Sequence, residues 1–114
     1  MDLSSLNFKP ELVRRYTAEG YWVGATSNEA LEEAARKFPN KVALVDVRRR
    51  ITYAQYYRAA QRLAAHWLSL GLTKDDVIGI QLPNWSEFGI AVNSAMLVGI
   101  PFCQFHADFR SKEV

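Results

Sequence analysis

The sequence predicts an α/β fold: the start of a parallel sheet, with a short N-terminal hairpin. Patterns typical of a helix, a hairpin, a helix, a strand, a helix and a strand follow one another along the chain, and this alternation builds parallel sheets with right-handed crossovers. The strand pattern Val77–Leu82 is apolar on both faces, as a central parallel strand requires. The helix that follows, Asn84 to about Val98, is apolar around most of its circumference and is therefore expected to be buried on several sides.

Two segments precede this pattern. Pro10–Glu19 reads as a short helix, because proline suits the first helical position and glycine the residue after the last. The loop Gly20–Gly24 then carries two large aromatic side chains, Tyr21 and Trp22, which we expect to pack onto another part of the protein. We therefore divide the chain into a helix and aromatic loop, residues 1–25, and an α/β subdomain, residues 26–114.

Capping boxes mark where the next two helices begin. In each box a threonine side chain and a Glu or Gln three residues later can satisfy each other's free backbone N–H groups. Thr26 with Glu29 predicts a helix over Asn28–Phe38, and Thr52 with Gln55 predicts a helix over Tyr53–Leu70. The inward face of this second helix is expected to carry Tyr56, Ala60, Leu63, Ala64, Trp67 and Leu68.

A hairpin is predicted between these helices, with strands Val42–Asp46 and Ile51–Tyr53 and a turn at Arg48–Arg50. Gly71 is expected to end the second helix, and Lys74–Asp76 to form a polar turn.

The last elements form one unit. Asn84–Glu87 is expected to cap the apolar helix and Gly99 to end it. The strand Ile100–Phe105 is then expected to lie parallel to Val77–Leu82, which completes a strand–helix–strand unit.

Composition excludes several classes of protein. The 114 residues are 49% hydrophobic and 23% charged, with a net charge of +2, which is typical of a globular domain and argues against nucleic acid or an anionic membrane as partner. The N-terminus has no apolar core of a secretory signal, and the apolar run Phe88–Cys103 is too short and too mixed to cross a bilayer. The single cysteine, Cys103, excludes an internal disulfide and fits a reducing, cytoplasmic compartment.

The residues suggest no active site on their own. None of the six glycines lies in a phosphate-binding spacing, and the two histidines are too far apart in sequence to indicate a metal site. We interpret Cys103 as a small buried hydrophobic residue rather than a catalytic thiol, and His66 as a surface residue rather than a proton shuttle. His106 follows the end of a strand, where α/β proteins bind ligands, but a loop histidine is favoured.

Three charged or aromatic groups also have structural interpretations. The run Arg48–Arg50 is interpreted as a solvated turn rather than a phosphate site, and Asp75 with Asp76 as turn residues rather than paired catalytic carboxylates. The tryptophans are interpreted as packing anchors, since no basic groove accompanies them: Trp22, Trp67 and Trp85. We therefore assign no catalytic, cofactor-binding or metal-binding residue.

An ordered series of short motifs nevertheless points to a family. The series comprises the helix before Pro39, Ala43–Asp46, Ile51–Tyr53, Leu63–Ala64, Leu70–Gly71, Val77, Leu82–Asn84, Glu87–Phe88, Ala95, Gly99 and Phe109-Arg110-x-x-Glu113. With this series the chain resembles, from about Tyr16 onward, the N-terminal portion of the adenylate-forming (AMP-binding) enzymes, which include acyl- and aryl-CoA synthetases and aryl-acid AMP ligases. Gly20-Tyr21-Trp22 is most similar to the aryl-acid (dihydroxybenzoate-type) branch and its close CoA-ligase relatives.

The sequence departs from the family pattern in two loops. The family usually has Gly-Asp where Asp75-Asp76 stands, and often a proline where His106-Ala107 stands.

The resemblance implies a large N-terminal domain of which these residues are the first part. The implied reaction joins a carboxylic acid to AMP from ATP with Mg, and then passes the acyl group to the thiol of CoA or of a phosphopantetheine carrier. The family's phosphate loop, acid pocket and catalytic lysine match no position here. The resemblance thus implies a non-catalytic scaffold that binds no cofactor alone, and whose partner is the remainder of the adenylation domain.

Two other readings remain open. The chain could be a stand-alone interaction module that binds a partner through the apolar helix Asn84–Val98, because an apolar surface of that size rarely faces water. It could also be an unrelated small nucleotide-binding domain, although the missing glycine loop argues against this. The scaffold reading predicts that the isolated chain binds no ATP and associates through its uncovered helix.

Overall fold

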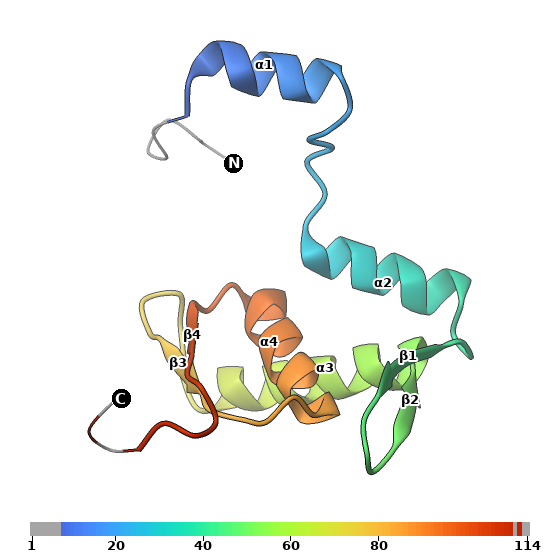
Figure 1. Cartoon of the computed structure of the whole chain (residues 1–114), viewed down its shortest axis with the longest axis vertical. Helices are drawn as coiled ribbons and strands as arrows, with labels where there is room; N and C mark the ends of the chain where they lie inside the picture. Colours follow the sequence, from blue (N-terminus) through green and yellow to red (C-terminus); the bar gives the residue numbers. More distant parts are fainter. Residues whose placement is uncertain (1–7, 111, 113–114) are drawn as a thin grey trace.

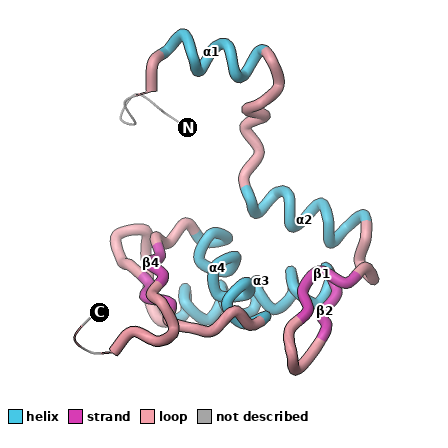
Figure 2. Tube along the Cα trace, viewed as in Figure 1, coloured by secondary structure: helices cyan, strands magenta, loops and turns pink. Residues whose placement is uncertain are grey.

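The computed structural model describes residues 8–110 and 112, and these form an α/β fold with two small sheets (Figures 1 and 2). In chain order the elements are α1 (Pro10–Ala18), α2 (Ser27–Lys37), β1 (Val42–Val45), β2 (Arg50–Thr52), α3 (Tyr53–Ser69), β3 (Ile78–Ile80), α4 (Ser86–Val98) and β4 (Phe102–Gln104). Residues 1–7 of the predicted N-terminal segment and Glu113 of the last motif lie outside the described residues. No helix in the described part is long and apolar enough to span a membrane.

Both predicted capping boxes are confirmed. The Thr26 backbone N–H donates to Glu29 Oε2 at 2.6 Å, and the Glu29 N–H donates back to Thr26 Oγ1 at 3.3 Å. Thr52 and Gln55 make the same reciprocal pair at the start of α3, at 2.8 and 3.3 Å. These local bonds satisfy donors that would otherwise lack partners, so the sequence alone sets where α2 and α3 begin.

The predicted ends of two helices are also confirmed. Gly71 follows α3 with φ +81°, and the Leu72 N–H donates back to the Trp67 carbonyl at 3.2 Å. Gly99 ends α4 with φ +68°. Both glycines occupy the left-handed region, where a side chain would be strained.

The hairpin and the strand–helix–strand unit form as predicted. β1 and β2 pair antiparallel, with Val45 opposite Arg50, and β3 and β4 pair parallel, with Ile78 opposite Phe102. The two pairs remain separate sheets. β3 was expected to be central, but it has a single neighbouring strand within the described residues, which leaves Val77 68% exposed.

The core lies where α3 packs against α4, with α2 against both (Figure 1). Ala60 of α3 and Ala95 of α4 are completely buried. At Gly89 of α4 an added Cβ would lie 3.1 Å from both Leu44 Cδ1 and the Tyr56 hydroxyl oxygen. Small residues therefore let the backbone of α4 approach both α3 and the hairpin closely.

Polar groups also cross this interface. The Tyr56 hydroxyl donates to the Gly89 carbonyl at 3.1 Å, and the Asn93 side-chain amide donates to the Tyr56 hydroxyl. Burial raises the pKa of Tyr56, so this hydroxyl stays protonated and can act as a donor.

Two expectations about burial need correction. The fully buried residues of α4 are small (Ser86, Ala91, Ser94 and Ala95), whereas its large side chains are only partly buried. Leu68 was expected to face inward on α3 but is 55% exposed. Within the described residues, α2 and the packing of α3 against α4 cover only part of the apolar surface of these two helices.

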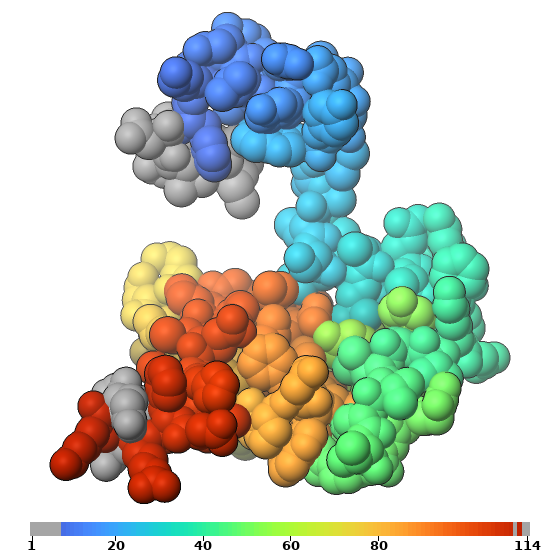
Figure 3. All heavy atoms as spheres, in the orientation of Figure 1, coloured from blue at the N-terminus to red at the C-terminus, as the bar shows by residue number. Residues whose placement is uncertain are grey.

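The helix α1 stands apart from the rest of the fold. It makes at most marginal contact with any other helix or strand, and the space-filling view shows a narrow neck joining it to the remainder (Figure 3). The radius of gyration is 16.7 Å, against about 13 Å for a compact domain of this length. The aromatic loop packs onto α1, as expected: the Trp22 ring lies 5.5 Å from the rings of both Phe8 and Tyr16. The division at residue 25 remains a prediction.

Candidate functional site

An open pocket of about 420 Å³ lies at the carboxyl ends of the parallel strands β3 and β4. Its lining comes from the segment after β3, the first turn of α4 and the end of β4, and consists of Leu82, Pro83, Asn84, Phe88, Gln104, Phe105, His106 and Ala107. This is the edge at which open α/β sheets bind ligands. Its volume suits a small molecule.

Main-chain contacts shape the wall of the pocket. Gln81 Nε2 donates to the carbonyls of His106 and Phe109, at 3.1 and 2.7 Å, which holds the segment after β4 against the end of β3. Phe105 packs over Gly79, where an added Cβ would lie 3.3 Å from the Phe105 ring. The glycine in β3 therefore makes room for an aromatic wall.

The pocket offers binding chemistry but no evident catalytic machinery. Its polar lining groups are the amides of Asn84 and Gln104 and the imidazole of His106. The His106 side chain is two-thirds exposed, and its Nδ1 accepts from the Asp108 backbone N–H at 3.3 Å. A nucleophile paired with a base is the usual requirement for acyl or phosphoryl chemistry, and the lining contains no such pair.

A second open pocket of about 360 Å³ lies between α2 and α3. Its lining mixes charged and apolar groups: Glu32, Ala35, Arg36, Ala54, Tyr57, Arg58 and Gln61. Two arginines and one glutamate stand on this lining, and no paired nucleophile and base is among its residues.

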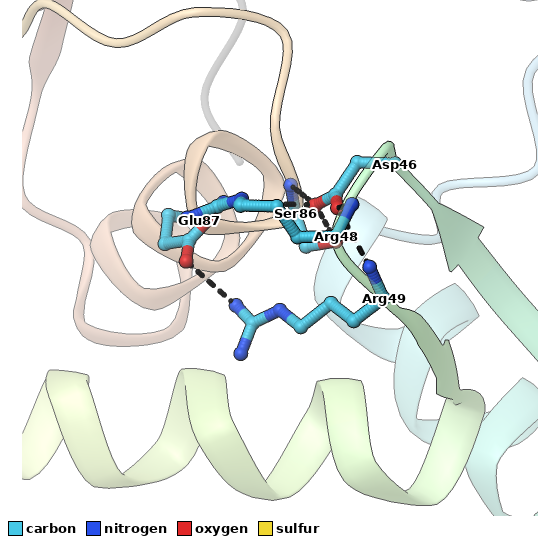
Figure 4. A network of polar contacts seen from close by, with 5 residues as sticks. All are labelled: Asp46, Arg48, Arg49, Ser86 and Glu87. Carbon is cyan, nitrogen blue, oxygen red and sulfur yellow. Dashed lines mark hydrogen bonds and ion pairs between the residues drawn. The ribbon is translucent and has the colours of Figure 1, made fainter.

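A cluster of polar contacts joins the hairpin to the start of α4, and Figure 4 shows Asp46, Arg48, Arg49, Ser86 and Glu87 of this cluster. We call these five residues, together with Trp85, the hairpin–α4 junction. One oxygen of Asp46 accepts from the backbone N–H groups of Arg48 and Arg49, at 2.8 and 3.0 Å. The other accepts from the backbone N–H and hydroxyl of Ser86, at 2.8 and 2.6 Å. A single carboxylate thus closes the hairpin turn and caps α4.

The electrostatics of the junction favour the ionised carboxylate. The Asp46 side chain is only 3% exposed. Hydrogen bonds from the Ser86 hydroxyl and N–H, and then from the Arg48 N–H, hold the pKa of Asp46 well below its usual range. The positive end of the α4 helix dipole acts in the same direction.

The arginines complete the junction from outside. Arg48 and Arg49 both form ion pairs with Glu87 in the first turn of α4, the Arg49 pair at 2.9 Å. The Arg48 guanidinium also lies 4.0 Å from the centre of the Trp85 ring. Paired and stacked cations of this kind have a structural use and are poorly placed to meet a phosphate.

One expectation at this junction is confirmed and one is wrong. Arg48 and Arg49 lie in the exposed hairpin turn, as expected, and they also form ion pairs with α4. Asn84–Glu87 was expected to cap α4 itself, but Trp85 occupies the N-cap position without a side-chain cap bond, and Asp46 supplies the acceptor. No local pattern could have indicated a cap provided from 40 residues earlier in the chain.

Other candidate residues lie as follows. Cys103 was expected to be buried but is exposed, because among the described residues β4 has β3 as its single neighbouring strand. His66 is exposed on α3, as expected. Asp76 Oδ2 accepts from the Thr73 N–H at 2.7 Å, which confirms the turn interpretation, and Asp75 pairs with Lys74 on the surface.

The tryptophans are in separate environments, Trp22 on α1, Trp67 half-buried on α3 and Trp85 at the junction, so they form no stacking platform. Among the residues that the structure describes, no three His, Cys, Asp or Glu side chains gather as a metal site would require.

Comparison with known proteins agrees with this architecture. The model of the AMP-binding enzyme family matches residues 31–114. The salicyl-AMP ligase / salicyl-S-ArCP synthetase of Mycobacterium tuberculosis is 34% identical over 97 residues, which cover 81% of this chain and 17% of that protein. The medium-chain fatty-acid–CoA ligase of Escherichia coli is 31% identical over 111 residues, covering 96% and 20%. The apo structure of Mycobacterium smegmatis MbtA superposes with a TM-score of 0.79 at 33% identity, covering 90% and 20%.

The chain therefore belongs to the AMP-binding enzyme family and has the fold of the N-terminal portion of an adenylate-forming enzyme. It spans about a fifth or less of the length of these relatives.

Proposed function

We propose that the chain forms the opening part of an ATP-dependent ligase, which activates a carboxylic acid as an acyl-adenylate and passes the acyl group to a thiol. The observation that carries this proposal is the family match, which covers residues 31–114. Relatives named as an AMP ligase and a CoA ligase support the two half-reactions. The thiol belongs to CoA or to a phosphopantetheine carrier, and Mg accompanies the ATP.

The acid is proposed to be an aryl carboxylate. Support comes from the salicyl-AMP ligase relative and from the Gly20-Tyr21-Trp22 segment, which resembles the aryl-acid branch. ATP and an acyl-accepting thiol would place the reaction in the cytoplasm.

The role proposed for these residues is that of a scaffold. The carboxylate with the most perturbed pKa, Asp46, is fully engaged in joining the hairpin to α4, so it is not free to act on a substrate. The pocket beside β3 and β4 carries one exposed imidazole and two amides. We therefore propose no catalytic residue in this chain, and we propose that the remainder of the adenylation domain is its partner.

An independent interaction module built on α4 is the less favoured reading. A module that kept only a binding helix would have no need of the hairpin, of α3 or of the strand–helix–strand unit, yet the family match over residues 31–114 extends across all of them. The large side chains of α4 also remain partly buried by α2 and α3 rather than fully displayed.

A chimaera tests the proposal. Residues 1–114 are joined to the part of the M. tuberculosis salicyl-AMP ligase that lies beyond its matched segment, and salicylate-dependent exchange of pyrophosphate into ATP is measured. The chimaera is expected to catalyse exchange, whereas the ligase without its matched segment does not. A matched control carries Ala60→Leu, which overfills the contact between α3 and α4 and is expected to lower activity through folding.

A chimaera that melts cooperatively but shows no exchange would contradict the scaffold role. The isolated chain gives a second test, because calorimetry should detect no ATP binding. Saturable ATP binding by the 114 residues alone would show that the nucleotide site lies within this chain.

A further inference from the structure

We propose that residues 8–25, which we call the arm, dock on the part of the adenylation domain that lies beyond these 114 residues. The inference rests on the proposed function and deepens it, because it names the surface that meets the partner.

The arm is a small unit held together by its own residues. Pro10 begins α1, and Arg15 pairs with Glu19 at 3.0 Å. The Trp22 ring packs against Phe8 and Tyr16, and these aromatic contacts fold the loop back onto the helix. The arm therefore has a defined shape before it meets any other surface.

The rest of this chain does not hold the arm in place. No residue of α1 is buried, and α1 makes at most marginal contact with the other elements. Figure 3 shows open space between the arm and the body on either side of the neck. The exposed surface of the arm carries charged side chains and also large apolar ones, among them Phe8, Tyr21 and Val23, which are 50%, 72% and 78% exposed. Exposed apolar side chains within one short segment indicate a surface that another part of a protein covers.

The solved relative indicates what covers this surface. Residues 26–114 make up less than four-fifths of the chain, so a superposition over 90% of it must include part of the arm. The matched part of that protein thus includes a counterpart of part of the arm, and the match accounts for only 20% of that protein's length. An extended position that its own chain does not stabilise has to be stabilised by other polypeptide, and the remaining four-fifths of the domain supplies it.

Trypsin cleavage within α1 tests the inference, since Arg14 and Arg15 lie on exposed helix. In the isolated 114-residue chain, trypsin is expected to cut α1 rapidly at these arginines. In the chimaera with the salicyl-AMP ligase, cleavage at these arginines is expected to be at least about tenfold slower, because docking must be undone before the helix can be cut.

Variants then locate the contact. The double substitution Tyr21→Ser with Val23→Ser removes exposed apolar side chains of the arm and is expected to return cleavage in the chimaera to the rate of the isolated chain. Val47→Ser is the matched control, because Val47 is 93% exposed on the hairpin turn, away from the arm. Its chimaera is expected to keep the protection.

The possible outcomes distinguish a failure of the docking inference from a failure of the proposed function. A chimaera that catalyses exchange while its arm is cut as fast as in the isolated chain overturns the docking inference and leaves the proposed function standing. A chimaera that neither melts cooperatively nor catalyses exchange overturns the proposed function, and the docking with it. An isolated chain whose arm is already protected, and which light scattering shows to be a dimer, assigns the surface to a second copy and also overturns the inference.

Discussion

The side chains of the hairpin–α4 junction contact residues distant in sequence, whereas those of the arm contact residues close in sequence. At the junction one carboxylate from the hairpin holds four donors, and Arg48 and Arg49 meet Glu87 across the interface, so segments 40 residues apart are locked together. In the arm, by contrast, α1 and the aromatic cluster pack against each other, and α1 makes at most marginal contact with the other elements.

The difference shows that local folding signals and tertiary contacts are separable in this chain. α1 has its own start and its own packed loop, just as α2 and α3 have their capping boxes. Of the four helices, α2, α3 and α4 pack against one another, whereas α1 makes at most marginal contact with them. Substitutions in the body should therefore change the stability of the isolated chain, and substitutions in the arm should not.

The largest effect is expected at the contact between α3 and α4. Ala60→Leu adds three carbons at a completely buried position, so overpacking should lower the free energy of unfolding by about 2–3 kcal/mol. Ala65→Leu is the matched control on the exposed side of the same helix, and it should change the value by less than about 0.5 kcal/mol. Urea unfolding of the isolated chain measures both, and equal effects would mean that α3 and α4 do not pack closely.

The next largest effect on stability is expected at the hairpin–α4 junction. Asp46→Ala removes the acceptor for Ser86, Arg48 and Arg49, and we expect the melting temperature to fall by roughly 5–8 °C. Asp46→Asn keeps an oxygen acceptor, so the melting temperature of this variant should fall less. Calorimetry of both variants decides this, and an unchanged midpoint for Asp46→Ala would show that the junction does not contribute to stability.

The same carboxylate predicts a pH dependence. The pKa of Asp46 is lower in the folded protein, so its ionised form stabilises the fold above the unfolded value of about 4 and this stabilisation is lost as the pH falls further. The difference in stability between the native chain and Asp46→Asn should therefore be larger at pH 7 than at pH 3. Comparing the two chains cancels the contributions of Glu29 and Glu33, whose pKa values are also lowered. A difference independent of pH would contradict this origin.

A smaller effect is expected at the start of α3. Thr52→Ala removes the side-chain acceptor for the Gln55 N–H and should lower the free energy of unfolding by about 1 kcal/mol. Thr52→Ser keeps a hydroxyl acceptor and should lower it much less. Chemical unfolding of the isolated chain gives both values. A serine variant as unstable as the alanine variant would mean that the hydroxyl is not the stabilising group.

The smallest effect is expected in the arm. Trp22→Ala breaks the aromatic cluster, yet the free energy of the main unfolding transition of the isolated chain should change by less than about 0.5 kcal/mol, because α1 makes at most marginal contact with the other elements. Hydrogen exchange should show faster exchange within α1 only. A change above about 1 kcal/mol in the main transition would show that the arm packs on the body after all.

Much of the local structure could be predicted, because each feature depends on residues close in sequence. The capping boxes at Thr26 and Thr52, the turn at Asp76 and the left-handed Gly71 and Gly99 are of this kind. The parallel pairing of β3 with β4 also followed, because a short helix between two strands permits little else.

The candidate site was predicted less completely. His106 was identified as a residue at the end of a strand, and it does line the pocket beside β3 and β4. Asn84 was interpreted as a helix cap and as part of the family series rather than as a pocket residue, and Gln104 was not singled out, since amides carry no signal of their own in a sequence. Cys103 was misplaced because an apolar strand pattern indicates what a strand would bury in a full sheet, and β4 has one neighbour here.

By itself the sequence determined the helices, their caps, the hairpin and the family resemblance, because all of these depend on residue type at short spacing. Only the tertiary structure decided that Asp46 caps α4, that Arg48 and Arg49 turn toward Glu87, and that the arm stands clear of the body. The physical reason is the same in each case. Which donor meets which acceptor, and which apolar face is covered, depends on how distant segments pack in space, and no local pattern of residues records that.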